Sequence, residues 1–439
     1  MVVKKVLKSN NILSLAGNFS AAIFGFLSFM LLTRITTTDT FGKWVLFITS
    51  STFVEMFRFG ITRVALIKYL SGAPEEERNI LIGSNWTIGV FLTITISLLL
   101  VIIRFLFKSS IDQSGFVYFF QWYPLLAFIN LPFNNALSVL QADMKFFKIL
   151  LIRLVNTGVF VIFLFFDLVY LKWGVDKIVT AYLLVNLFTS LMTIFLGWDN
   201  IKLAKYYDIN VIKKILHYGK FSLGTLIGTN LLKSADTFII GMSPLLGTTA
   251  VALFSVPIKM TEILEVPLRS FVATYFPRMS KAHRNGNTNE LRRLFYSYSG
   301  VTSLLFIPFL LVCFFMANQV ILVLGGKEYL SSLPVFYVFC IYGLFLPIDR
   351  FTGVALDSVN KPDRNFYKVL AMALVNIIGD AIAVFYFNSI LGVAIVTIVM
   401  TIVGVFVGLY QLKKEFPFKI RMVFVSGFQT ILSRIKKAI

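Results

Sequence analysis

Ionisable side chains lie inside long apolar stretches of this sequence, where they are costly unless they meet partners or water. In the stretch from Asn230 to Arg269, Lys233 and Asp236 stand three residues apart. The same stretch ends in a charged stripe, formed by Lys259, Glu262, Glu265 and Arg269. At 100° per helical residue, the stripe falls within an arc of about 120°. A charged stripe inside a bilayer costs several kcal/mol unless it faces partners or a water-filled cavity. We therefore expect it to line a path for a polar substrate.

Further ionisable residues interrupt other apolar stretches, namely Glu55, Arg58, Asp349, Arg350 and Asp380. Glu55 and Arg58 again stand three residues apart, and Asp380 follows Asn376 by four. A structural alternative stays open, because an acid and a base at this spacing can simply neutralise each other and hold helices together. Charges near helix ends can also snorkel to the membrane surface.

The composition identifies the elements that must carry these charges. Hydrophobic residues make up 57% of the 439 residues, charged residues 14%, and the mean hydropathy is +0.82. Soluble domains are closer to 25% charged. The apolar residues come in runs of about 20, the length of a helix that crosses the hydrocarbon core. The sequence therefore predicts an all-α polytopic membrane protein, with no room for a large soluble domain.

About twelve spans are predicted from these runs. They cover approximately residues 11–33, 41–62, 80–106, 116–140, 150–170, 178–198, 221–242, 250–276, 293–317, 333–357, 366–387 and 390–411. Lys and Arg gather in alternate short loops, which the positive-inside rule places in the cytoplasm together with both termini. The same rule accounts for the net charge of +20, so we expect no nucleic-acid partner.

The chain divides around a polar break in its middle. We predict an N-terminal lobe of about six helices over 1–198, a cytoplasmic amphipathic connector over 199–220 and a second lobe of about six over 221–411. Residues 412–439 form a basic amphipathic tail, expected to lie on the inner membrane surface. Two lobes of equal orientation favour a substrate site between parallel repeats.

Sequence signatures of catalysis are missing. His217 and His283, the two histidines, stand in predicted loops outside any H-E-x-x-H pattern, and the chain has no G-x-x-x-x-G-K-[ST] motif. Cys313 and Cys340 lie in apolar runs and suggest buried free thiols. The sequence therefore predicts a protein that is not an enzyme and has no cofactor, no resident metal and no ATP motor of its own.

Four short motifs resemble one known family. In residues 31–71 the family pattern is matched by Arg34, Phe41-Gly42, Gly60 and Arg63. In residues 234–260 it is matched by Asp236, Gly241, Leu246-Gly247, Ser255 and Lys259. Gly326 and Tyr329 match its Phe-Gly-x-x-Tyr loop, and residues 391–399 resemble the opening of its last span without the second glycine. The motifs resemble Wzx-type polysaccharide-export flippases of the multidrug/oligosaccharidyl-lipid/polysaccharide exporter (MOP) superfamily.

The resemblance implies a MATE-like, V-shaped pair of lobes in the bacterial inner membrane, working by alternating access. Its implied substrates are oligosaccharides on undecaprenyl diphosphate, for O-antigen, capsule or exopolysaccharide, bound in a central cavity with basic side chains. The candidate substrate contacts are then Arg58, Lys233, Lys259, Arg269 and Arg350. The candidate charge-balancing or ion-coupling residues, for H+ or Na+, are Glu55, Asp236, Glu262, Glu265 and Asp380. We expect a monomer that can associate with polysaccharide assembly proteins.

Other functions stay open. A lipid II flippase and a cation-coupled multidrug exporter belong to the same superfamily, although the first span has no acid of the kind that such exporters usually carry. A membrane glycan polymerase or ligase calls for a large outside loop with catalytic residues, and the predicted outside loops are short. A membrane scaffold would leave the charged stripe unexplained.

Overall fold

The computed structural model describes residues 10–417 and 419–438, with side chains throughout except those of 10–12, 14, 15, 220–229, 233 and 434–438. Every regular element in this part of the chain is helical, which confirms the all-α prediction. Ten of the described helices are long and apolar enough to cross a membrane. The chain is therefore a multi-pass membrane protein.

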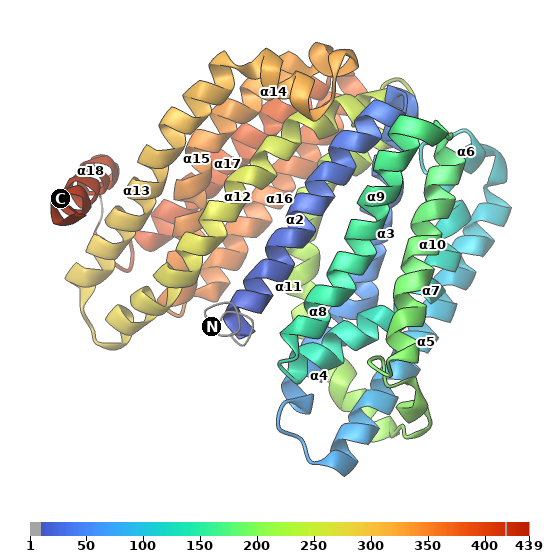
Figure 1. Cartoon of the computed structure of the whole chain (residues 1–439). Coiled ribbons are helices and arrows are strands. Elements are labelled where there is room, and N and C mark those ends of the chain that lie inside the picture. The colour runs from blue at the N-terminus through green and yellow to red at the C-terminus, as the bar shows by residue number, and fades with distance from the viewer. Residues whose placement is uncertain (1–9, 418, 439) are drawn as a thin grey trace. The chain divides into compact units, whose positions relative to one another are not determined.

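The chain forms two compact units, Met1–Asn230 and Leu231–Ile439. The N-terminal unit contains α2 (Asn10–Ile35), α3 (Thr38–Gly60), α4 (Arg63–Leu70), α5 (Glu75–Leu106), α6 (Lys108–Asp112), α7 (Val117–Ala142), α8 (Phe146–Arg153), α9 (Val159–Phe166) and α10 (Val175–Phe195). Two π-helical turns, η1 (Leu154–Gly158) and η2 (Asp167–Leu171), extend the fifth predicted span, and η3 (Ile201–Lys205) is a short 3-10 turn. Figure 1 shows α2 to α10 as the blue and green helices.

Local sequence accounts for two helix starts in this unit. The side chain of Thr37 accepts a hydrogen bond from the backbone N–H of Thr40 at 3.3 Å and so caps α3. Three glutamates, Glu75, Glu76 and Glu77, occupy the first turn of α5, where negative charge complements the helix dipole. Such local signals explain why the predicted spans and the helices agree to within a few residues at most ends.

The segment predicted as a connector has two parts. Its first part contains η3, which packs on α5 so closely that a Cβ on Gly83 would lie 2.1 Å from the Tyr206 carbonyl oxygen. Its second part is the beginning of α11 (Ile209–Gly241), which continues without a break into the seventh predicted span. Ile215 on this part is fully buried in the apolar cluster of α4 and α5. The turns of α11 around Ile215 thus belong to the core of the N-terminal unit.

The C-terminal unit begins within α11 and contains the remaining elements. They are α12 (Gly247–Arg284), α13 (Thr288–Phe315), α14 (Ala317–Leu324), η4 (Lys327–Ser332), α15 (Leu333–Ser358), α16 (Pro362–Ala381), η5 (Ile382–Tyr386), α17 (Ile390–Leu412) and α18 (Ile420–Ala438). Three prolines lie inside α12, at 257, 267 and 277. Of these elements, η4 is a 3-10 turn and η5 a π-helical turn that lengthens α16.

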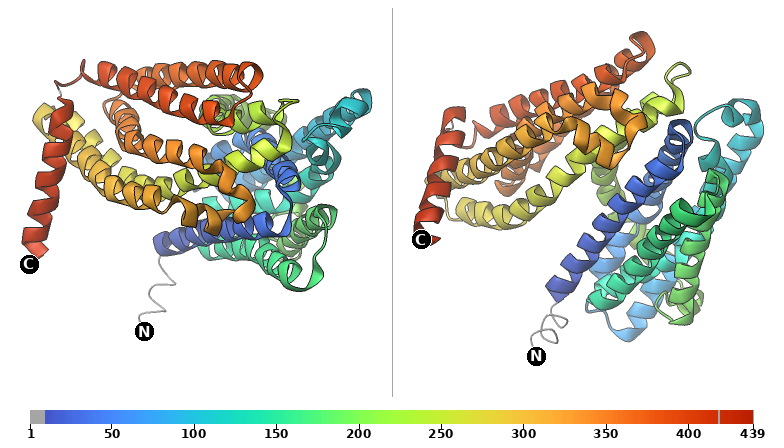
Figure 2. Two further views of the ribbon diagram at one scale, coloured as in Figure 1. Left: turned by 90° about the horizontal axis from the view of Figure 1, so that it is seen from above. Right: turned by 45° about the horizontal axis from the view of Figure 1, so that its top comes forward.

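The tail helix α18 lies across α13 (Figure 2). Two glycines make this crossing possible, because a Cβ on Gly300 would lie 1.9 Å from the Val423 carbonyl oxygen and 2.9 Å from the Gly427 Cα. The Tyr296 hydroxyl accepts a hydrogen bond from the Lys419 backbone N–H at 2.7 Å. The crossing therefore fixes α18 to the C-terminal unit, while Ile420 and Phe428 stay exposed.

Candidate functional site

In the N-terminal unit, Arg58 is the centre of a buried polar network. Its Nη1 donates to Glu55 Oε1 at 2.5 Å, and its Nη2 donates to Thr93 Oγ1 at 2.5 Å and to the Ala127 carbonyl oxygen at 2.8 Å. The Tyr123 hydroxyl donates to the same Glu55 oxygen at 3.0 Å. The network thus joins α3 to α5 and α7.

The position of Arg58 bears on its predicted role. Its side chain is almost fully buried, at 2% exposed, and its guanidinium is occupied by partners inside the unit. Glu55 Oε2 and Arg58 Nε are buried without a hydrogen-bond partner in the described structure. Arg58 therefore holds three helices together in this structure, and a direct contact with substrate stays a prediction.

In the C-terminal unit, two buried carboxyl groups share one amide. Asn376 Nδ2 on α16 donates to Asp236 Oδ1 on α11 at 3.0 Å and to Asp380 Oδ2 on α16 at 2.9 Å. Thr397 Oγ1 on α17 lies 3.5 Å from Asp236 Oδ2. All four side chains are buried, with Asp236 3% and Asp380 0% exposed. The structure thus brings together two of the residues predicted for ion coupling, from segments far apart in sequence.

The chemistry of this acidic pair follows from its burial. Two neighbouring carboxylates in a low-dielectric interior repel each other strongly. Either one of them binds a proton, or a cation lies between them. Asp380 Oδ1 and Asn376 Oδ1 are buried and have no hydrogen-bond partner in the described structure. Carboxylate, amide and hydroxyl oxygens are the donors that hard cations prefer. The pair can therefore hold either a proton or a small hard cation.

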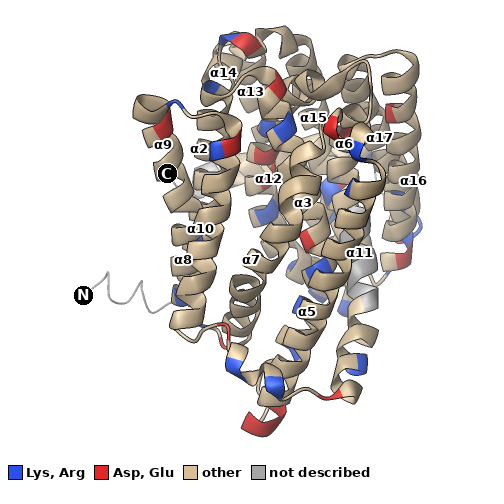
Figure 3. Ribbon diagram, turned by 90° about the vertical axis from the view of Figure 1, so that its right-hand side faces the viewer, with Lys and Arg blue, Asp and Glu red and all other residues tan. Residues whose placement is uncertain are grey.

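The charged stripe of α12 is paired along its own helix. Lys259 Nζ donates to Glu262 Oε1 at 2.7 Å, and Arg269 Nη2 donates to Glu265 Oε2 at 2.5 Å. Glu262 and Arg269 are exposed, whereas Lys259 and Glu265 are half-buried. Figure 3 shows such charged residues within the length of the helices as well as at their ends. Lys233, the other basic candidate nearby, has a side chain outside the described residues.

Another ion pair in the C-terminal unit joins α15 to α16. Lys368 Nζ lies 2.7 Å from Asp349 Oδ1 and donates to the Asp349 carbonyl oxygen at 2.6 Å. Lys368 is 3% exposed and lies near the beginning of the predicted span 366–387. Arg350, which follows Asp349 in the sequence and was predicted as a substrate contact, is exposed. Lys368 was not among the predicted site residues. It follows Pro362 by six residues and lies in the first turns of α16.

Outside the spanning segments, Asp143 ties together two helix ends of the N-terminal unit. Arg78 Nη1 donates to Asp143 Oδ1 at 2.7 Å, and Lys145 Nζ donates to Oδ2 at 2.8 Å. Burial raises the pKa of this carboxyl, but the hydrogen bonds and charges of Lys145 and Arg78 outweigh it and hold the pKa below its usual 3.8. At Asp199, by contrast, burial dominates and raises the pKa above its usual value.

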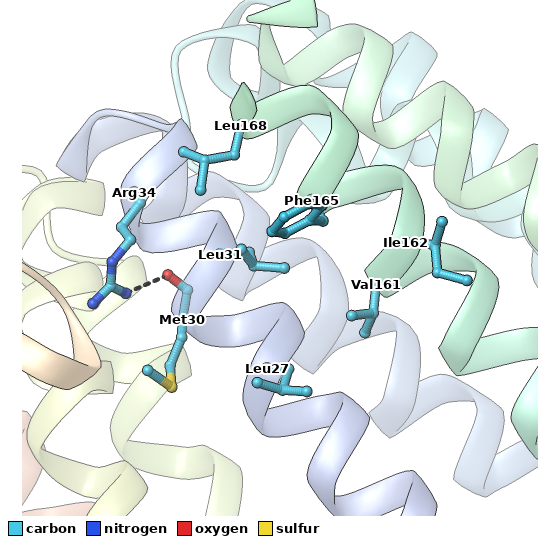
Figure 4. Close-up of a pocket in the computed structure, with 8 residues that line it drawn as sticks. All are labelled: Leu27, Met30, Leu31, Arg34, Val161, Ile162, Phe165 and Leu168. Atoms are coloured by element: carbon cyan, nitrogen blue, oxygen red, sulfur yellow. Dashed lines mark hydrogen bonds between the residues drawn. The ribbon is translucent and has the colours of Figure 1, made fainter. Parts of the chain in front are cut away.

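An apolar groove of about 520 Å³ runs between α2 and the α9–η2 segment (Figure 4). Leu27 and Leu31 line it from α2, and Ile162 and Phe165 line it from α9. Arg34 stands at one end, where its Nη1 donates to the Met30 carbonyl oxygen at 2.7 Å. In a membrane protein, such a groove is complementary to a hydrocarbon chain.

The predicted site residues thus fall into three groups. Asp236 and Asp380 meet in a buried site, Glu55 and the buried Arg58 form an ion pair in the other unit, and the remaining candidates with described side chains lie along α12 or at Arg350. Asn376 and Thr397 complete the acidic pair, and neither was among the predicted site residues. A signal existed for Asn376, because it stands four residues before Asp380 in an apolar helix.

The sequence of residues 31–334 matches the family described as polysaccharide biosynthesis protein. Among curated proteins, no sequence matches this chain significantly. Solved structures show the same fold. An inward-facing MATE family multidrug resistance transporter of the MOP superfamily is 16% identical, with a TM-score of 0.74 over 90% of this chain and 95% of that one. The lipid II flippase MurJ in an inward closed conformation is 18% identical, with a TM-score of 0.71 over 96% and 91%.

A MOP superfamily transporter from Pyrococcus furiosus is also similar, at 16% identity and a TM-score of 0.58 over 93% of this chain and 95% of that one. The fold is therefore that of the MOP superfamily of membrane transporters and flippases, which confirms the resemblance seen in the sequence. The chain belongs to the polysaccharide biosynthesis protein family, whose match covers most of its length.

Proposed function

We propose that this protein flips undecaprenyl-diphosphate-linked oligosaccharides from the cytoplasmic to the outer leaflet of the bacterial inner membrane, for O-antigen, capsule or exopolysaccharide assembly. The observation that carries the proposal is the family match over residues 31–334, on a chain whose fold is that of MOP transporters and flippases. A polysaccharide biosynthesis protein with this fold has the architecture for moving a lipid-linked glycan. Both termini lie in the cytoplasm in this proposal.

The acidic pair supplies the coupling step in this proposal. Asp236 and Asp380 take up a proton or Na+ from one side of the membrane, and the ion offsets one of the two negative charges of the pair inside the C-terminal unit. Asn376 holds both carboxyl groups with hydrogen bonds of 3.0 and 2.9 Å, so that the ion and three helices are linked. Because α11, α16 and α17 all contribute side chains, ion release changes how these helices pack.

Basic side chains in the spans would contact the diphosphate and the sugars. Arg269 and Arg350 are exposed on α12 and α15, and Lys259 is half-buried on the same stripe. A guanidinium suits a diphosphate because its planar fork donates two hydrogen bonds at once, whereas a lysine acts as a point charge. Arg58 serves the same function indirectly, by holding α3 against α5 and α7.

The test is deletion of the gene in its native host, followed by analysis of surface glycan and of undecaprenyl-linked intermediates. Loss of a surface polysaccharide with build-up of the complete lipid-linked unit on the inner face is the expected result. Complementation with wild-type protein restores the glycan, and complementation with D236N or D380N at equal protein level does not. Intact glycan after deletion would overturn the proposal.

Two related functions are distinguished by the same deletion. Lethality with lysis would favour transport of lipid II, the substrate that the solved MurJ flippase is named for. Altered drug sensitivity with intact glycan would favour a multidrug exporter like the solved MATE transporter. The polysaccharide biosynthesis family match favours the oligosaccharide over both.

A further inference from the structure

A small polar pocket of about 150 Å³ lies in the N-terminal unit, and two arginines line it. Arg63 comes from the first turn of α4 and Arg153 from the last turn of α8. Asn18 on α2 and Gln141 on α7 complete its polar lining. Four helices therefore converge on one pocket with two positive charges.

The hydrogen-bond partners of the two arginines are neutral. Arg63 Nη2 donates to Gln141 Oε1 at 3.0 Å, and Arg153 Nη1 donates to Asn18 Oδ1. In the described part of the chain, no carboxylate lies within 4 Å of either guanidinium.

Two other arginines of the same unit are balanced by acids. Arg58 pairs with Glu55 and Arg78 with Asp143. Arg63 and Arg153, in contrast, repel each other across the pocket, and both are half-buried. Two like charges that are partly removed from water are destabilising unless an anion joins them. The pocket is therefore an incomplete charge arrangement within the protein itself.

The geometry suits one kind of anion. Each guanidinium uses one nitrogen on a neutral acceptor, which leaves further N–H donors of its planar fork for a ligand. Phosphate oxygens match this fork in a bidentate manner. A volume of about 150 Å³ accommodates a phosphate or diphosphate group but not an oligosaccharide. Leu13 and Ile149 give the pocket an apolar wall, which favours an anion attached to a hydrocarbon chain.

We propose that this pocket binds the phosphate or diphosphate headgroup of a membrane lipid, at the end of the unit that the charge distribution predicts to be cytoplasmic. Arg63 and Arg153 contact the anion, and Gln141 and Asn18 hold the two guanidiniums in place. The headgroup belongs either to an anionic phospholipid of the inner leaflet or to the polyprenyl diphosphate lipid before it is flipped. Only the second source rests on the proposed function.

The test measures binding of two soluble lipid analogues to the purified full-length protein in detergent. Dioctanoyl phosphatidylglycerol represents the phospholipid, and farnesyl diphosphate represents the polyprenyl diphosphate. The wild-type protein is expected to bind at least one of them saturably. Because a charge-assisted hydrogen bond contributes about 1.5–3 kcal/mol, R63Q and R153Q should each weaken that binding by about tenfold or more. The double variant R63Q/R153Q should bind neither analogue.

A matched control variant is R292Q. Arg292 is half-buried and donates to the neutral Asn289 at 3.2 Å, but it lies on α13 in the other unit. R292Q should bind as the wild type does. The conservative double variant R63K/R153K keeps both charges without the forks, and it should retain weakened binding, which separates loss of the ligand from loss of the fold. Binding by R63Q/R153Q as tight as by the wild type, or no binding of either analogue by the wild type, would overturn the inference.

The two analogues also separate this inference from the proposed function. Tighter binding of farnesyl diphosphate assigns the pocket to the transported lipid on its way in. Tighter binding of phosphatidylglycerol assigns it to a bilayer lipid that holds the N-terminal unit. If deletion leaves surface glycans intact while phosphatidylglycerol still binds through Arg63 and Arg153, the proposed function fails and the lipid site stands.

Discussion

Replacing Asp380 by Asn should remove the cation dependence that we expect of this protein. Asp380 Oδ2 accepts from Asn376 Nδ2, while its Oδ1 is buried with no partner in the described structure. The substitution keeps the size of the side chain and removes one of the two carboxylates that would face a bound ion. Asp236 alone would then balance the cation.

The size of the effect follows from Coulomb's law. A carboxylate about 4 Å from a monovalent cation contributes about 4 kcal/mol at an effective dielectric constant of about 20. That corresponds to roughly a thousandfold in affinity. It is an upper bound, because the free energy of removing the carboxylate from water offsets part of the attraction. We expect affinity to fall at least tenfold. At a Na+ concentration of about 100 times the wild-type Kd, stabilisation then drops from about 2.7 to about 1.4 kcal/mol or less.

The assay is thermal unfolding of the purified protein against NaCl, with choline chloride holding the ionic strength constant, and against pH without Na+. The wild type should respond to one of the two ions and D380N should lose most of that response. D357N is the matched control, because Asp357 also accepts from an asparagine, Asn365, at 3.0 Å, but here both hydrogen bonds of that amide go to the same carboxylate. A wild type that is insensitive to both ions, or a D380N protein that responds like the wild type, would refute the reasoning.

Three other predictions concern positions away from the acidic pair. R58Q should destabilise the protein by about 3–5 kcal/mol, because it removes the buried charge that partners Glu55, and folded yield and thermal unfolding in detergent would show this. G300V should release α18 from α13, because the Gly300 Cβ position lies 1.9 Å from a backbone oxygen, and we expect faster limited proteolysis before α18 with the rest of the chain intact. The Asp143 carboxyl has a lowered pKa, so its contribution to stability is present above pH 3.8 and is lost as the pH falls through the lower, folded-state value. D143N should therefore differ from the wild type in denaturant midpoint at pH 7 and converge with it in acid, and an unchanged difference at low pH would contradict this sign.

Helix positions in this protein could be predicted from sequence because their causes are local. A run of about 20 apolar residues must form a helix in a bilayer, since lipid offers no other partner for the backbone. Caps and first-turn acids such as Thr37 and Glu75 then set the ends. For the same reason, the predicted break between the spans 221–242 and 250–276 agrees with the structure, in which α11 ends at Gly241 and α12 begins at Gly247.

From the sequence, the candidate site was predictable only as a set of ionisable residues in apolar spans, without their contacts. Asp236 and Asp380 are 144 positions apart in the printed numbering, and no periodicity relates a residue on α11 to one on α16. The spacing of Asn376 and Asp380 marks Asn376 as a neighbour of Asp380, but its hydrogen bond to Asp236 is identified only once the two helices are packed together. Sequence reasoning also grouped Lys259, Glu262, Glu265 and Arg269 as one stripe, whereas the structure divides them into two pairs along one helix.

The sequence by itself determined the secondary structure of this protein. It specifies helices of membrane-spanning length, with ionisable residues at positions where lipid makes a charge costly. Tertiary structure decided what each charge meets. Arg58 donates to Thr93 and to a backbone oxygen of α7, and Lys368 pairs with Asp349 between α16 and α15. The physical reason is range, because hydropathy and capping act within a few residues, while the energy of a buried charge depends on neighbours that only packing brings within hydrogen-bond distance.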